Sequence, residues 1–337
     1  MPDTTPFGGA QGLARPRGLH AFAVGVAAAT LLLVFAGGLV TSTESGLSVP
    51  DWPTTYGQNM FTFPVSKWVG GIRYEHVHRL IASGVGLLTV ILAVWLARRE
   101  PRRWVRRLGY LALAAVVLQG MLGGLTVLLL LPPAVSVAHA CLAQTFFCLV
   151  VTIAVVTSPR WSPPSSAGSL REALAASPLG RTAAVTAVAV FLQLLIGAVM
   201  RHTKAGLAIP DFPLSLGRVV PPLSSFPVAI HFLHRVGAIV VAALVGLCLF
   251  RALRSPRGAL RRAGIALAVL VVVQVGLGAA TVLTRKAVLV TTAHVASGAL
   301  LLGGTVAFCA ASLAAERRRN NVIPIRSAVA GRASAWK

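Results

Sequence analysis

The sequence predicts an all-α integral membrane protein with eight transmembrane helices, built as two tandem four-helix bundles. Its composition is the first observation behind this prediction: 56% of the 337 residues are hydrophobic and 12% are charged, whereas soluble domains contain about 25% charged residues. The second is a series of apolar segments close to the length of about 20 residues that crosses a bilayer. The third is an internal repeat, because both halves of the chain carry the same motifs in the same order.

The eight predicted segments divide into two sets of four. Four segments return the chain to its starting side, so both copies enter the membrane in the same direction, and a pseudo-twofold axis along the membrane normal should relate them. The halves should span residues 21–157 and 182–313, with a cytoplasmic linker at 158–181, a cytoplasmic N-terminus at 1–20 and a basic cytoplasmic tail at 314–337. The segments are expected at 21–40, 74–97, 108–131, 135–157, 182–200, 228–250, 262–284 and 288–313.

Basic residues determine the expected orientation. The net charge is +23, and the 31 Lys and Arg residues crowd the ends of the apolar segments, which favours a role in orientation over nucleic-acid binding. With the N-terminus inside, 22 of them fall on inner connections and termini, 7 fall on outer connections, and Arg79 and Arg235 lie within segments. Because positive residues are enriched on the cytoplasmic side, we expect a multi-pass protein of the cell inner (plasma) membrane, with both termini cytoplasmic and no nucleic-acid partner.

The repeat contains polar motifs as well as apolar segments. Each copy has an outer loop with the pattern Gly-Leu-x-x-Pro-Asp-aromatic-Pro, at 46–53 and at 206–213. Each copy then has a histidine followed by an arginine, a glutamine, and a second histidine. In chain order these residues are His78, Arg79, Gln119 and His139 in the first copy, and His234, Arg235, Gln274 and His294 in the second.

The four repeated histidines point to haem iron. All should lie roughly one to two turns below the outer surface, at about 1.5 Å per residue. Two imidazoles from different helices at similar depth can bind one haem iron from opposite sides inside a four-helix bundle. A histidine in a membrane helix can instead be a packed polar contact, and zinc fits less well because two ligands per half fall short of the usual three or four. The candidate iron ligands are His78 with His139, and His234 with His294.

Two other features of the repeat suit a haem. Arg79 and Arg235 directly follow candidate ligands and are candidate contacts for the anionic propionates, although an arginine at this depth can also extend to the membrane surface. Small residues on the neighbouring segments leave room for a flat ring, and close helix packing explains them equally well. These small residues are Gly120, Gly123 and Gly124 in the first copy and Gly276, Gly278, Ala279 and Ala280 in the second.

The copies differ one turn before the first histidine. Glu75 precedes His78 by three residues, whereas His231 takes the corresponding place before His234. A spacing of three puts each residue on the same helix face as its ligand. A carboxylate beside the ring can act as an acid or base, or can stabilise positive charge on a substrate. We therefore expect chemistry in the first half and electron transfer in the second, unless Glu75 is an interface carboxylate paired with Arg73 or Arg79.

Taken together, these motifs resemble the heme A synthase family, which assists cytochrome oxidase assembly. The resemblance covers about residues 20–313, and its motifs are specific as a set and weak singly. It implies eight membrane helices in two halves, and oxidation of the C8 methyl group of haem O to a formyl group, giving haem A. It is carried by Glu75-x-x-His78-Arg79, Gln119 with Leu125-Thr126-Val127, His139, His234-Arg235, Gln274, His294 and the two outer loops.

The resemblance also implies roles for single residues. It makes Glu75 the catalytic carboxylate, His78 and His139 the ligands of the substrate haem O, and His234 and His294 the ligands of a haem b cofactor. Candidate protein partners are haem O synthase and cytochrome oxidase subunit I, in addition to the lipid bilayer. Many bacterial members carry two cysteines in the first outer loop, whereas residues 41–73 contain none; the chain therefore resembles the members without this pair.

Two other functions use the same features. A diheme b-type electron-transfer cytochrome of the membrane would need the four histidines but not Glu75. A haem or small-molecule transporter would fit the parallel repeats, but transporters tend to have helices broken near the midplane. The predicted segments show no paired proline breaks, and their polar residues cluster near one face. The sequence does not identify the electron acceptor, the source of the oxygen atom or the oligomeric state.

Overall fold

The computed structural model describes residues 17–159, 161 and 170–333, and within them the chain is helical with no strand. Eight helices are long and apolar enough to cross a membrane, which confirms the predicted fold class. The short helix α5 (Leu170–Ala176) precedes the second set of four. The eight long helices are α1 (Arg17–Ser42), α2 (Gly70–Arg99), α3 (Arg103–Leu128), α4 (Pro133–Thr157), α6 (Pro178–His202), α7 (Phe226–Leu253), α8 (Gly258–Leu283) and α9 (Val288–Ala333).

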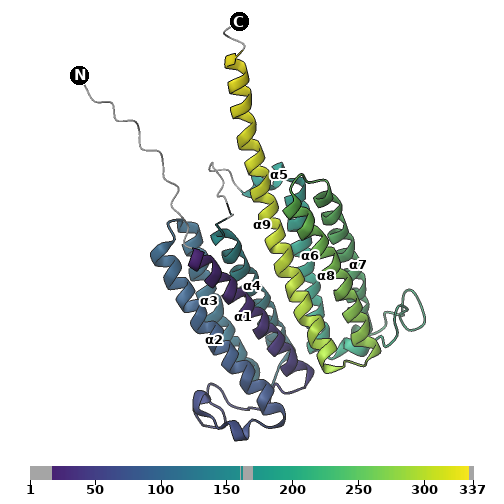
Figure 1. Cartoon of the computed structure of the whole chain (residues 1–337). Helices are drawn as coiled ribbons and strands as arrows, with labels where there is room; N and C mark the ends of the chain where they lie inside the picture. The colour runs from purple at the N-terminus through teal and green to yellow at the C-terminus, as the bar shows by residue number, and fades with distance from the viewer. Residues whose placement is uncertain (1–16, 160, 162–169, 334–337) are drawn as a thin grey trace.

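The helix ends follow local chemistry and refine the expected boundaries. Helices α4 and α6 begin with a proline at the first position, where a missing N–H costs nothing. Helix α3 ends at Leu128, three residues before the predicted end, because Leu130 and Leu131 both adopt a φ of 61°. Helix α9 continues to Ala333, beyond the predicted end at 313, and extends past the other helices in Figure 1.

Each set of four helices forms a closed bundle. In the first, α1 contacts α2 and α4, and α3 contacts both of these; in the second, α6 contacts α7 and α9, and α8 contacts both of these. The bundles stand side by side (Figure 1) and meet where α4 packs against α9, α1 against α9, and α6 against α4. This set of contacts is unchanged when the two bundles are exchanged, as the predicted pseudo-twofold relation requires.

Each bundle has its own apolar core. Leu92, Leu96 and Ile153 are completely buried in the first bundle, and Val245 and Leu302 are nearly so in the second. Many large apolar side chains point outward instead, among them Leu87 and Val272, which are 63% and 71% exposed. Exposed apolar surface on this scale would aggregate in water. It is the surface expected of helices that contact lipid.

The two large outer loops lie at the same end of the molecule, and the turn at residues 51–58 of the first has the same backbone conformation as the turn at 211–218 of the second. They connect α1 to α2 and α6 to α7 (Figure 1). In the first, the Asp51 carboxylate accepts hydrogen bonds from the backbone N–H groups of Tyr56 and Gly57, each at 2.8 Å. In the second, Asp211 accepts from Leu216 at 2.7 Å and Gly217 at 2.8 Å. The Pro-Asp-aromatic-Pro motif therefore encodes one turn that is used twice.

The contact between the bundles leads to a stability prediction. A Cβ atom at Gly303 of α9 would lie 2.6 Å from Phe147 Cε1 of α4, and Phe147 is 3% exposed. Glycine to alanine normally favours a helix by about 1 kcal/mol, but overpacking costs about 1–3 kcal/mol. We expect Gly303→Ala to lower the thermal unfolding temperature of the detergent-purified protein. Gly86→Ala on α2, where the new methyl group meets open space, should not; equal effects of the two substitutions would contradict this packing.

The Asp51 turn leads to a prediction about pH. Burial acts to raise the pKa of Asp51, but hydrogen bonds from Gly57, Thr54 and Tyr56 outweigh it and hold this pKa below the ordinary value of 3.8. A lowered pKa means that the carboxylate stabilises the folded loop above its ordinary pKa, and that this stabilisation is lost as the pH falls through the lowered value.

Amide hydrogen exchange of Tyr56 and Gly57, corrected for intrinsic rates, should therefore show protection at neutral pH that is lost on acidification. Asp51→Asn should be less protected at neutral pH and should lack the acid transition. Protection of the wild-type amides that does not change with pH would contradict the assigned role.

Candidate functional site

The structure places the four predicted histidines at matched depths near the end of the molecule where the outer loops lie. His78 and His234 each lie eight residues after the first residue of α2 and α7, and His139 and His294 each lie six residues after the first residue of α4 and α9. At 1.5 Å per residue these depths are about 12 Å and about 9 Å. All four side chains are partly buried.

Each histidine ring packs against a glycine of the adjacent helix. A Cβ atom on any of these glycines would lie 3.0–3.1 Å from the Cε1 atom of the ring, which is tighter than ordinary van der Waals contact. Gly123 and Gly278 were predicted to leave room for the haem ring. In the structure they make room for the imidazoles themselves. The four pairs are Gly37 with His78, Gly123 with His139, Gly197 with His234, and Gly278 with His294.

Within each half, the structure brings the two predicted ligands together. The rings of His234 and His294 have centroids 6.4 Å apart and stand at 74° to each other. A metal–imidazole bond is about 2 Å long, so this separation leaves room for one ion between the rings. In the first half His78 and His139 lie within electrostatic range of each other, and the Nδ1 atoms of both are buried without a hydrogen-bond partner among the described residues.

These unpaired nitrogen atoms fit a metal group. Buried polar atoms are normally hydrogen-bonded, so two buried imidazole nitrogens without partners suggest a missing ligand. Among the described residues, no group of three or more His, Cys, Asp or Glu side chains could hold a metal ion. A group that needs one imidazole on each side, as haem iron does, fits this arrangement better than an ion held by protein ligands alone.

Glutamine side chains and carbonyl groups orient the rings. Gln119 Nε2 donates to the His139 carbonyl at 3.0 Å and lies 3.3 Å from His139 Nε2. The Nδ1 atom of His294 lies 3.1 Å from the Gln274 carbonyl, a contact that leaves Nε2 free to bind a metal. Gln193 Nε2 donates to the His234 carbonyl at 2.7 Å and lies 3.1 Å from His234 Nδ1. The repeat gave no signal for Gln193, because Leu33 occupies its place in the first copy.

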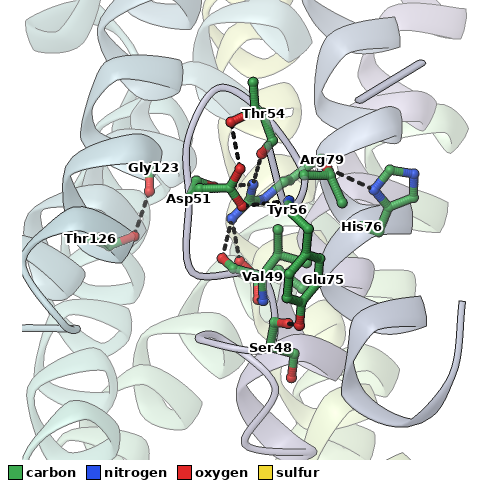
Figure 2. A network of polar contacts seen from close by, with 11 residues as sticks. Ser48, Val49, Asp51, Thr54, Tyr56, Glu75, His76, Arg79, Gly123 and Thr126 are labelled. Atoms are coloured by element: carbon green, nitrogen blue, oxygen red, sulfur yellow. Dashed lines mark hydrogen bonds and ion pairs between the residues drawn. The ribbon is translucent and has the colours of Figure 1, made fainter. Parts of the chain in front are cut away.

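Arg79 fastens the first outer loop to the helix that carries His78. Its Nη1 atom donates to the carbonyls of Asp51 at 2.7 Å and Thr54 at 3.1 Å. Its Nη2 atom donates to the Val49 carbonyl at 2.8 Å and to Glu75 Oε1 at 2.6 Å. Figure 2 shows this guanidinium group at the centre of the network, enclosed by the loop.

Arg235 makes the corresponding contacts in the second half. Its Nη1 atom donates to the Leu214 carbonyl at 2.7 Å, and its Nη2 atom donates to the carbonyls of Ile209 at 3.0 Å and Asp211 at 2.6 Å. Each of these carbonyls lies 160 residues after its counterpart in the first loop. Both arginines are thus engaged by loop carbonyls, and their contact with haem propionates stays a prediction.

Glu75 and His231 have the same position and different chemistry. Glu75 is 3% exposed; its Oε2 atom accepts from the Val49 N–H at 2.8 Å, while its Oε1 atom accepts from Arg79. His231 is also 3% exposed, and its Nδ1 atom lies 3.3 Å from the Ile209 N–H. The ion pair with Arg79 is one of the structural roles that the sequence left open for Glu75. Its catalytic role stays a prediction.

Two functional candidates that the sequence did not reveal lie in and beneath the first loop. His76 is completely buried, with ring centroids 4.8 Å from Trp68 and 5.3 Å from Phe63. Trp52 packs on Gly124 of α3, where a Cβ atom would lie 2.4 Å from the indole. Phe232 replaces His76 in the second copy. The sequence did not reveal these contacts, because both depend on how the first loop folds against α2 and α3.

Comparison with known proteins identifies the family. Residues 20–69 and 65–306 match the COX15-CtaA family, described as cytochrome oxidase assembly protein. A heme A synthase of Symbiobacterium thermophilum is 34% identical over 238 residues, covering 68% of this chain and 74% of the relative. Heme A synthases of Halalkalibacterium halodurans and Rhizorhabdus wittichii are 28% and 29% identical, covering 82% and 86% of this chain and 91% and 92% of the relatives. The chain therefore belongs to the COX15-CtaA family of cytochrome oxidase assembly proteins.

Proposed function

We propose that this protein is a heme A synthase, an oxidoreductase that converts the C8 methyl group of haem O to a formyl group and so supplies haem A for cytochrome oxidase. Relatives that cover most of the chain bear the name heme A synthase. In this proposal the first bundle binds haem O as substrate between His78 and His139. The second bundle holds haem b as a resident cofactor between His234 and His294.

The difference between Glu75 and His231 is the observation that carries the proposal. The two halves share their helix arrangement, the packing of each histidine ring against a glycine, and the arginine contacts to the loop. These shared features would explain haem binding in both halves. A buried carboxylate one turn from His78 occurs in the first half, and an imidazole takes its place in the second. This difference supports a division of labour, with substrate chemistry in the first half and electron transfer in the second.

The local structure fixes where the Glu75 carboxylate can act. Val49 N–H and Arg79 each hold one of its oxygen atoms, so its orientation is determined by the outer loop and by α2 together. With water as the source of oxygen, the first oxidation consumes one water and converts the methyl group to the alcohol, and the second converts the alcohol to the aldehyde. Each of the two steps releases two protons and passes two electrons to an external acceptor. Glu75 can accept such a proton at a carboxylate oxygen, or it can stabilise positive charge at the reacting carbon.

The remaining groups of the site would bind the haems and orient the imidazole ligands. When bound, haem b would supply a one-electron carrier whose potential the protein can tune. Gln193 and Gln274 orient the imidazoles on which it would bind, and Gln119 does the same for His139 on the substrate side. The outer loop lies over the site, and Trp52 packs against α3, an arrangement that would shield the reacting carbon from bulk water.

The orientation in the cell belongs to the same proposal. The excess of basic residues on one side supports an orientation with both termini in the cytoplasm and both haem sites toward the outer face of the plasma membrane. The apolar outer surface of the bundles is suited to the hydroxyethylfarnesyl tail of haem O, which can lie along it or in lipid. Haem O synthase and cytochrome oxidase subunit I are the candidate partners for substrate delivery and product transfer.

The ion pair between Glu75 and Arg79 favours one alternative function. A diheme b-type electron-transfer cytochrome would use the same four histidines and would need Glu75 as a structural anion that holds Arg79 and the loop. Such a protein would retain haem b in both halves and would form no haem A.

A substitution that removes the Glu75 charge separates these functions. Glu75→Gln keeps an amide oxygen for Val49 or Arg79, so haem binding should persist. Haem A formation should fall by about 10²–10⁴-fold, which is the typical contribution of a positioned acid or base. The measurement is extraction and mass analysis of the haems that copurify from cells that also make haem O, in which haem O or its alcohol should accumulate.

His231→Gln is the matched control, because it changes the corresponding position of the second half and should leave haem A formation largely intact. Undiminished haem A from Glu75→Gln would eliminate the catalytic role of this carboxylate. Haem b alone in the wild-type protein, despite abundant haem O, would favour the electron-transfer cytochrome.

A further inference from the structure

The side chain of Arg201 extends from α6 of the second bundle and contacts α1 of the first. Arg201 is the penultimate residue of α6, at the end of the molecule where the outer loops lie, and it is partly buried. Its Nη2 atom donates to the Gly38 carbonyl at 3.0 Å and to Ser42 Oγ at 2.8 Å, both on α1. Thr292 of α9 donates to the same Ser42 hydroxyl at 3.1 Å. Three helices from the two bundles therefore meet around this guanidinium group.

This junction lies between the two histidine pairs. Arg201 lies within electrostatic range of His294 of the second pair, and the next residue, His202, lies within that range of His139 of the first pair. Thr292, which shares Ser42 with Arg201, is two residues before His294. Arg201 thus stands beside the second pair, on the side that faces the first bundle.

The positive charge of Arg201 has no anionic partner among the described residues. The ion pairs found there join Arg79 to Glu75 and Arg102 to Glu100. Glu44, two residues after Ser42, is exposed and makes no ion pair with Arg201. An arginine within a membrane helix normally pairs with an anion or a carbonyl group, because an unpaired charge away from water is costly.

The guanidinium group also has unused donors. Arg79 and Arg235 use both terminal nitrogens, each of which donates two hydrogen bonds. In Arg201, both hydrogen bonds come from Nη2, and within the described part of the chain Nη1 and Nε make none. Arginine binds a carboxylate with two parallel N–H donors, so Arg201 retains the geometry needed to hold one.

The repeat indicates that Arg201 has a role that is specific to one half. At the offset of 160 residues that relates the outer loops, Thr41 is the counterpart of Arg201 and Ser42 is the counterpart of His202. The shared scaffold therefore folds without a cation at this place in the first half. The charge is specific to the second half and to its boundary with the first.

We propose that Arg201 binds a propionate carboxylate of the haem held between His234 and His294. This inference rests on the proposed function, since it requires a haem in the second half. The bound carboxylate supplies the anion that Arg201 lacks, and it fixes that haem at the boundary with the substrate half. Reduction adds an electron to the haem, so a cation at its edge favours the reduced form and raises the reduction potential. Arg201 thereby makes this haem a better acceptor of electrons from the first half.

The experiment is a redox titration of the resident haem in the full-length protein, purified from cells that make haem b but no haem O. Arg201→Met and Arg201→Gln should shift the midpoint potential of the haem retained by His234 and His294 to lower values. Arg201→Lys, which keeps the charge, should shift it less. Gln can still donate to α1, so a shift in this variant reports loss of charge and not loss of the contact between the bundles.

Three control variants test the assignment. Arg181→Met removes a positive charge from the opposite end of the same helix, and Ser42→Ala removes the hydroxyl that Arg201 contacts while the charge remains; both should leave the potential unchanged. Glu44→Gln should also have no effect. An unchanged midpoint potential in Arg201→Gln at full haem content would overturn the proposal. A shift of the potential in Glu44→Gln as large as that in Arg201→Met, in either direction, would also overturn it.

The source of the carboxylate is tested separately with haem O. If Arg201→Gln weakens haem O binding while the potential of the resident haem is unchanged, the carboxylate belongs to the substrate haem and the assignment to the second half is wrong. Failure of the proposed function would look different. In that case the wild-type protein from cells that make haem O would contain haem b alone and no haem A, whatever the effect of Arg201.

Discussion

In each half, one arginine joins the outer loop to the helix that bears the first histidine. Arg79 and Arg235 each donate to three carbonyls of the adjoining loop, and every acceptor in one half has its counterpart in the other. Hydrogen bonds to a charged group contribute about 1.5–3 kcal/mol each, and backbone carbonyls near the membrane need such donors. Because the arginine directly follows the histidine, the same contacts that hold the loop also fix the rotation of the helix that presents the imidazole.

In the proposed function, the roles of the two halves differ because certain positions of the shared scaffold carry different residues in each half. Contacts with glycines and glutamines position two imidazoles in each half, and the repeat therefore accounts for two similar pairs of candidate ligands. Three of the positions that differ between the halves are Glu75 against His231, Gln193 against Leu33, and Arg201 against Thr41. The first supplies a carboxylate where the substrate would react. The other two lie beside the second histidine pair, where they can orient a ligand or tune a potential. The repeat thus provides two similar sites, and single positions make them different.

Much of the fold could be predicted because membrane helices are encoded by long apolar runs and the repeat doubles the signal. The four histidines and Glu75 could be found because they are polar residues at matched places in an apolar chain. The contacts of Arg79 could not, since the loop conformation that brings three carbonyls to one guanidinium group depends on the whole turn around Asp51. His76 lies buried under the loop because Phe63 and Trp68 fold over it, a contact that depends on the loop conformation. Gln193 and Arg201 have no counterpart and so left no signal in the repeat.

The division of labour between the halves is tested most directly by the type of haem that each histidine pair retains. Variants with alanine at His78 or His139, and others with alanine at His234 or His294, would be purified from cells that make haem O, and their haems extracted and identified. The first two variants should keep haem b and lose haem O and haem A, whereas the last two should lose haem b. Retention of haem b after loss of His234 or His294, or equal loss of every haem type from all four variants, would contradict this assignment.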